Sequence, residues 1–196
     1  MITLYEVNAD KKALEKSIKI MNDTWELFFN KETQLFQKNI IKDNDLFASP
    51  LDLNDSNIPN GNSVYLLISN KLYSITNDKI WSERNEVLKK SFHQVLNSYY
   101  SQMFSFIKTL DICDNSLSFT FSGTSQSIKE IQLYLQKEYL GVATFVYQLN
   151  NDTKPSVIVC KNQTCSNKLT NINEAVEYLS KSCLLYTSDA ADDLRG

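Results

Sequence analysis

The spacing of apolar residues changes once along the chain, near residue 113, and this change limits the folds that the chain can adopt. Before this point, apolar residues recur every three or four positions, as in helices that bury one face. After it, Leu117, Phe119 and Phe121 alternate with small polar residues, as in a half-buried strand. The pattern predicts a mainly α-helical part followed by a smaller α/β part.

The first part predicts helices at residues 11–28, 63–76, 78–96 and 98–112. Asn8 or Asp10 is placed to start the first of these helices. Residues 35–41 predict a short extended piece, and residues 43–62 form a long polar connection. Successive amphipathic helices joined by short turns favour helical hairpins.

The second part predicts strands and helices in the order β-α-β-β-α, at residues 116–122, 125–139, 142–149, 156–160 and 173–182. A β-α-β order favours parallel pairing of its first two strands, because the helix returns the chain to the same end of the sheet. We therefore expect helical hairpins in residues 1–112, an α/β portion in residues 113–182, and a separate tail in residues 183–196.

The tail differs in origin from the rest of the chain. Residues 183–192 read Cys-Leu-Leu-Tyr-Thr-Ser-Asp-Ala-Ala-Asp, which is similar to one reading frame of a transposase-end adapter used for sequencing libraries. The alternative is a natural short acidic tail. Without residues 183–196 the formal net charge moves from −3 to about −1, since three acids and one base leave.

Charge and hydropathy exclude several classes of partner. A nearly neutral body offers no basic field for nucleic acid and no polybasic patch for a membrane surface. No segment approaches the roughly 20 apolar residues that cross a bilayer, and residues 1–10 lack the apolar core of a secretory signal. We expect a cytoplasmic protein without a cofactor.

The polar turn from Asp55 to Ser63 is the main candidate site. Pro59 and Gly61 set the bend, and Asn62 or Ser63 is able to cap a helix that begins at Val64. The turn gathers a carboxylate, amides and a hydroxyl at the positive end of that helix. A structural cap and a binding loop both fit this pattern. Among the carboxylates, the local context recommends Asp55 for acid–base work or for accepting hydrogen bonds from a ligand.

Cys160 and Cys165 form a second candidate site. Four residues separate these cysteines, whereas redox pairs and zinc knuckles typically use two. Packed or loop-closing thiols, an occasional disulfide, and metal or redox use remain open. Because His93 is the sole histidine and lies far away in sequence, we expect no metal site. We expect Cys113 to be a small buried apolar residue.

A further short motif, residues 122–125, reads Ser-Gly-Thr-Ser before a predicted helix. Such a motif is able to bind an anion through backbone N–H groups. With one glycine, however, the motif favours a plain helix cap.

Three segments in fixed order resemble the thioredoxin-domain-containing proteins of the YyaL type, which include the eukaryotic spermatogenesis-associated members. The segments are residues 25–36, residues 55–63, and residues 160–165 followed by Leu169 and Thr170. The family pattern at the second segment is close to D-G-A-x-P-S-G-N-S. Matching positions there are Asp55, Pro59, Gly61, Asn62 and Ser63, and departing positions are Ser56, Asn57 and Asn60.

This resemblance implies a C-terminal fragment of a larger protein. Full-length relatives carry an N-terminal thioredoxin-like domain and then an α/α toroid similar to six-hairpin glycosidases and sugar epimerases. The chain would supply the last toroid hairpins and the terminal α/β portion. The turn would line a carbohydrate-type pocket, in which Asp55 acts as acceptor or acid–base and Asn62 and Ser63 contact a sugar-like small molecule. The alternative is a non-catalytic scaffold or interaction module for the missing thioredoxin-like domain.

Overall fold

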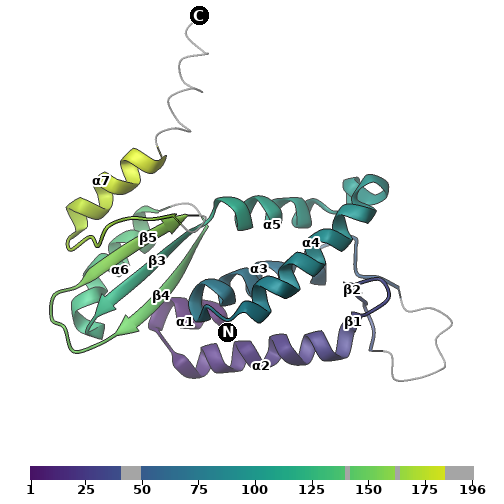
Figure 1. The fold of residues 1–196 in the computed structure, drawn as a ribbon, viewed down its shortest axis with the longest axis horizontal. Helices are drawn as coiled ribbons and strands as arrows, with labels where there is room; N and C mark the ends of the chain where they lie inside the picture. The colour runs from purple at the N-terminus through teal and green to yellow at the C-terminus, as the bar shows by residue number, and fades with distance from the viewer. Residues whose placement is uncertain (41–49, 140–141, 162–163, 184–196) are drawn as a thin grey trace, which may run out of the picture. The chain divides into compact units, whose positions relative to one another are not determined.

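The computed structural model describes residues 1–40, 50–139, 142–161 and 164–183 (Figure 1). The chain divides into two compact units, Met1–Ser116 and Leu117–Gly196. The tail predicted at residues 183–196 lies, beyond Cys183, outside the described residues.

The first unit is helical apart from one small pair of strands. Its elements are α1 (Ile2–Asn8), α2 (Lys11–Phe28), β1 (Phe29–Asn30), β2 (Leu35–Phe36), α3 (Gly61–Thr76), α4 (Lys79–Tyr99), the 3-10 turn η1 (Tyr100–Gln102) and α5 (Phe104–Asn115). The predicted helices at residues 11–28, 63–76 and 78–96 are confirmed to within three residues at each end. The predicted cap is confirmed for α2, because the Asp10 side chain accepts hydrogen bonds from the backbone of Lys12 and Ala13.

Two predictions for this unit need correction. The helix expected at residues 98–112 begins at Phe104, because α4 and η1 continue to Gln102. Met103 is fully buried, so the bend at this residue places its side chain in the core. The extended piece expected at residues 35–41 is a two-residue strand, β2, paired antiparallel with β1. Residue 41 of that prediction lies outside the described residues.

The core of the first unit draws buried side chains from helices α1 to α5 and from β2. Phe92 on α4 and Phe106 on α5 stack with ring centroids 3.6 Å apart, and both are buried. Leu66 and Leu72 on α3 are fully buried in the same cluster. Burial on facing helices stabilises the unit by roughly 25 cal/mol for each Å² of apolar surface removed from water.

Arg84 joins α4 to α2 and α3. Its Nη1 donates to Asn22 Oδ1 over 2.8 Å and to Tyr65 Oη over 3.0 Å. The guanidinium carbon lies 4.8 Å from the ring centroid of Trp25 and 5.2 Å from that of Trp81. Burial raises the pKa of Tyr65 to about 12 although Arg84 lowers it, so Tyr65 remains a neutral phenol at physiological pH.

The second unit is a mixed sheet with helices. Its elements are β3 (Leu117–Gly123), α6 (Ser125–Glu138), β4 (Ala143–Leu149), β5 (Ser156–Lys161), β6 (Thr164–Cys165) and α7 (Ile172–Cys183). The strand order is β4-β3-β5-β6. β3 and β4 are parallel, as the β-α-β order predicts, and β5 is antiparallel to β3. The predicted β-α-β-β-α order is therefore confirmed, with β6 as an additional short strand.

Alternation along β3 explains the core of the second unit. Phe119 and Phe121 are fully buried, whereas the intervening Ser118 and Thr120 are partly exposed. Side chains of α6 and α7, among them Leu135 and Ala175, pack in the same cluster. The architecture is thus mainly helical with a smaller α/β part. None of the helices in the described residues combines the length and the apolar character that a membrane crossing requires.

Candidate functional site

Asp55 lies in the connection that leads into α3. Its backbone N–H donates to the carbonyl of Gln102 over 2.7 Å, which ties this connection to the end of η1. Phe104 and Ser105, the first residues of α5, follow Gln102 closely in the chain. The fold therefore brings the turn before α3 together with the start of α5, about 50 residues later in the sequence.

The Asp55 carboxylate accepts hydrogen bonds from two residues. Asn60 donates its backbone N–H and its side-chain Nδ2 to Oδ1, over 3.1 and 2.9 Å. Ser105 donates its backbone N–H to Oδ2 over 2.7 Å and its hydroxyl to Oδ1. Four donors therefore hold one half-buried carboxylate and connect the start of α3 to the start of α5.

These contacts decide the charge of Asp55. Burial raises the pKa of Asp55, but the hydrogen bonds from Ser105 and Asn60 together outweigh burial and hold the pKa below its ordinary value. The carboxylate is therefore ionised at neutral pH. A general acid needs a raised pKa in order to carry a proton at neutral pH, and lowering the pKa of a carboxylate weakens it as a base. The arrangement suits a fixed acceptor of hydrogen bonds.

Asn60 is the N-cap of α3, and the prediction that Asn62 or Ser63 caps a helix beginning at Val64 is wrong. The helix begins at Gly61, and Asn60 Oδ1 accepts from the backbone N–H and the hydroxyl of Ser63, both over 2.9 Å. Asn60 has the extended backbone that a cap requires, and Asp55 holds the other end of its amide.

Asn62 and Ser63 are buried within the first turn of α3, with exposed fractions of 0% and 1%. Asn62 Oδ1 accepts from the backbone N–H of Phe36 over 2.9 Å, and its Nδ2 donates to the carbonyl of Asp52 over 2.7 Å. The Ser63 hydroxyl lies 2.9 Å from that of Ser105. The polar atoms of both residues thus serve the chain itself, and contact of either residue with a ligand stays a prediction.

Gly61 allows a close approach between the turn and the chain before it. Its backbone N–H donates to Asp52 Oδ2 over 2.5 Å, and a Cβ at this position would lie 2.5 Å from the same oxygen. A side chain therefore cannot fit here without moving the Asp52 carboxylate. Glycine at position 61 thus leaves room for the Asp52 carboxylate, whose negative charge complements the dipole at the N-terminus of α3.

The surface beside this network is exposed and mixed in character. Residues 56–59 are exposed, and Ile58 is 72% exposed. Phe104, the neighbour of Ser105, is 66% exposed, and Tyr100 is 62% exposed. Ligand sites for neutral polar molecules combine apolar or aromatic surface with a few fixed polar groups. Exposed apolar and polar side chains therefore occur within a few residues of Asp55 and of its backbone partner Gln102.

Sequence reasoning missed two members of the network. The preference of N-caps for asparagine was a usable signal for Asn60, which precedes a glycine and lies three residues before Ser63. No local signal points to Ser105, because its role depends on the return of the chain through α3 and α4. Asp55 and Ser63 were identified, and the fold brings both to the same network.

Cys160 and Cys165 are joined by a disulfide bond. They lie directly opposite each other in the antiparallel pair of β5 and β6. Cys113 is a free, partly buried thiol in the first unit, and burial raises its pKa to about 11. Within the described ranges, no group of three or more His, Cys, Asp or Glu residues is placed to hold a metal ion.

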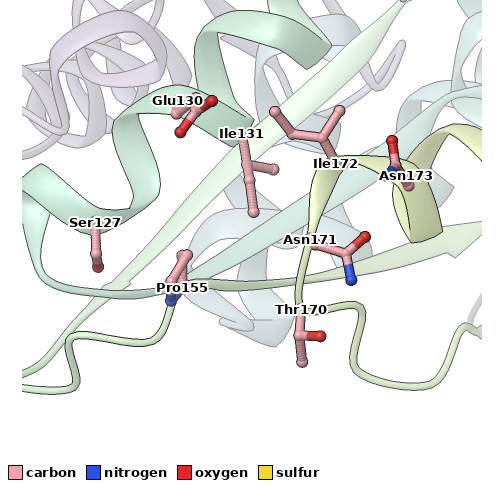
Figure 2. Close-up of a pocket in the computed structure, with 8 residues that line it drawn as sticks. All are labelled: Ser127, Glu130, Ile131, Pro155, Thr170, Asn171, Ile172 and Asn173. Carbon is pink, nitrogen blue, oxygen red and sulfur yellow. The ribbon is translucent and has the colours of Figure 1, made fainter.

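A shallow hollow of about 430 Å³ lies in the second unit between α6, Pro155 and the start of α7 (Figure 2). Ile131 and Ile172 supply apolar surface, and Glu130 supplies a carboxylate. The Asn171 side chain accepts from the backbone N–H of Glu174 at the start of α7, so part of this rim serves the helix.

The helix cap that the sequence favours at residues 122–125 is confirmed. Thr124 is the N-cap of α6, and its hydroxyl accepts from the backbone N–H of Ser127 over 3.0 Å. Gly123 has a φ of 142°, a backbone conformation that residues with a Cβ atom rarely adopt. The glycine therefore shapes the bend from β3 into α6, and the hydroxyl is occupied by the helix.

These features define a mainly helical unit with a polar turn held by a half-buried hydrogen-bond network, and a small α/β unit with a cross-strand disulfide. Neither a model of a known protein family nor a curated protein matches the chain.

Proposed function

We propose that the chain is part of a YyaL-type protein, in which the hairpins of the first unit belong to an α/α toroid and the turn at residues 55–60 forms one wall of a carbohydrate-type pocket. In this role Asp55 fixes the shape of the turn and transfers no proton. The single observation that carries the proposal is the set of four hydrogen bonds that Asn60 and Ser105 donate to the Asp55 carboxylate.

The surroundings of the turn support a neutral, hydroxyl-rich ligand. A sugar ring presents both apolar C–H faces and polar hydroxyl edges. Phe104 and Ile58 offer exposed apolar surface, and Ser56 and Asn57 offer exposed polar groups in the same part of the unit. Among the described residues, Ser105 donates the one hydrogen bond to Asp55 Oδ2, so this oxygen retains capacity to accept a further one from a hydroxyl.

Titration of the isotope-labelled chain with glucose, mannose and N-acetylglucosamine tests the proposal by NMR. We expect the largest chemical-shift changes at residues 55–60 and 104–105, with dissociation constants on the order of millimolar for a single open wall. Phe104→Ala removes the exposed ring without touching the network, and is expected to weaken binding. Ile80→Ala, another exposed apolar position in the first unit, is the matched control. Shifts spread evenly over the chain, or confined to the second unit, would refute the assignment.

A second experiment separates the fixed acceptor from a catalytic acid. In a longer YyaL-type protein with the same turn, Asp55→Asn keeps one carbonyl oxygen but removes the charge. We expect weaker sugar binding together with a disturbed turn. Lost turnover with unchanged binding and an unchanged turn would instead make Asp55 a catalytic group, contrary to the proposal.

The alternative function, a non-catalytic scaffold for a thioredoxin-like domain, is favoured by a different observation. Ile20 and Leu27 lie seven positions apart on α2, hence on one face of the helix, and each is more than 40% exposed; apolar side chains that share an exposed face are a feature of interaction surfaces. Replacing the positions that match Ile20 and Leu27 with serine in a longer relative distinguishes the two. Lost docking of the thioredoxin-like domain, with sugar binding intact, would favour the scaffold.

A further inference from the structure

The Cys160–Cys165 disulfide lies at the edge of the sheet in the second unit. β6 is the last strand in the order β4-β3-β5-β6, and it comprises Thr164 and Cys165. Cys165 is exposed, whereas Cys160, on β5, is half-buried. A reagent in solution therefore reaches the sulfur of Cys165 more readily than that of Cys160.

The chain that follows Cys165 covers the edge of β5 that faces away from β3. Ser166 donates its backbone N–H to the carbonyl of Val159 over 2.8 Å, and its hydroxyl accepts from the Val159 N–H over 3.0 Å. Leu169 and Val157 exchange two backbone hydrogen bonds of 2.8 and 2.9 Å. The backbone groups of β5 thus find partners in residues 164–169, and they would be open to other strands if this segment left.

We propose that Cys160 and Cys165 form a reversible redox pair that exchanges electrons with a dithiol, and that this exchange controls how firmly residues 164–169 stay on the edge of β5. The inference is independent of the carbohydrate-type pocket, because it concerns the other unit. Nothing in it requires a metal or a bound cofactor.

The exchange proceeds in two steps. A thiolate of the dithiol attacks Cys165 Sγ, the Cys160–Cys165 bond breaks, and Cys160 leaves as a thiolate that takes up a proton. The second thiol of the reductant then loses its proton and attacks its own sulfur in the mixed disulfide, which releases Cys165 as a thiolate that is protonated in turn. The protein gains two electrons and two protons, and the dithiol becomes a disulfide.

The size of the effect follows from the loop that the bond closes. Cys160 and Cys165 are separated by 5 positions, so the bond constrains a short hairpin. Loop-closure entropy for so few residues corresponds to an about 30-fold change in the population of the opened segment. Reduction is therefore expected to raise local opening of residues 164–169 while leaving β3, β4 and β5 paired.

The redox equilibrium is tested on the whole chain in mixtures of reduced and oxidised dithiothreitol. After trapping with an alkylating reagent, trypsin cleaves behind Lys161 and Lys168, so that each cysteine of the pair lies on its own peptide. We expect the linked peptide pair to be replaced by two alkylated peptides as the reduced form of the reagent increases, and to return on reoxidation. A bond that survives excess dithiothreitol in the folded chain, or thiols that never join in excess oxidised reagent, would overturn the proposal.

Hydrogen exchange measured by mass spectrometry tests the structural consequence. Amides of residues 165–169 are expected to exchange about 30-fold faster in the reduced chain, and at the same fast rate in the double variant Cys160→Ser/Cys165→Ser. Cys113→Ser, in the other unit, is the matched control and should retain the difference between the oxidised and reduced chains. Equal exchange of these amides in both redox states would refute control of the β5 edge.

Discussion

Replacing Ser105 with alanine removes one of the four donors to Asp55 and leaves the backbone donor of residue 105 in place. Hydrogen bonds to charged groups contribute about 1.5–3 kcal/mol, so we expect a loss of about 2 kcal/mol in the free energy of unfolding at pH 7. With a urea m-value of about 2 kcal/mol/M for a unit of this size, the midpoint should fall by about 1 M.

Tryptophan fluorescence is a suitable probe for this measurement, because Trp25 and Trp81 are the only tryptophans and both lie in the first unit. Ser74→Ala is the matched control. The Ser74 hydroxyl donates to the carbonyl of Asn70 on an exposed face of α3, and its loss should change stability by no more than about 0.5 kcal/mol.

The pH dependence supplies a second check on the same variant. The pKa of Asp55 in the folded chain lies below its ordinary value of 3.8, so the contacts to the carboxylate stabilise the fold above that value. This stability is lost as the pH falls through 3.8 towards the lower pKa of the folded chain. The deficit of Ser105→Ala should therefore be complete at pH 7 and at pH 5 and shrink near pH 3. A deficit equal to that of Ser74→Ala, or one that is unchanged at pH 3, would refute the role assigned to the carboxylate.

Three further substitutions or reactions test other parts of the structure. Gly61→Ala should lower stability by about 1 kcal/mol in urea unfolding, because the new Cβ displaces the Asp52 carboxylate from its hydrogen bond with the backbone of residue 61, and the same substitution should cost less in an Asp52→Ala background. Phe92→Ala should cost about 3–5 kcal/mol by the same assay, because it empties a buried site against Phe106. Burial raises the pKa of Cys113 to about 11, so at pH 8 iodoacetamide should modify this thiol in the folded chain far more slowly than in urea; equal rates would contradict its burial.

The sequence was sufficient to predict most helices and the β-α-β-β-α order, since these follow from local periodicity. It did not predict α1, whose seven residues are too few to show two full turns of an apolar stripe. It also placed the start of α5 too early, because the burial of Met103 depends on packing against other helices. The toroid stays a prediction.

In the candidate site, residues whose partners lie nearby in the sequence could be predicted, whereas residues whose partners lie far away could not. The turn from Asp55 to Ser63 was identifiable from its residue types. The preference of helix N-caps for asparagine would also have been enough to identify Asn60. Ser105 was not, because a hydrogen bond across 50 positions leaves no pattern in a single sequence. The same holds for the contact between Asn62 and Phe36.

Lysine and arginine are not interchangeable at position 84 of this chain. Lysine supplies nearly all of the basic side chains, and Arg84 is the sole arginine in the described ranges. A lysine there would offer one ammonium group on a flexible stem. It would lack the planar fork that reaches Asn22 and Tyr65 while lying against the rings of Trp25 and Trp81. In relatives of this chain, arginine at this position should persist even where genome composition favours lysine codons elsewhere.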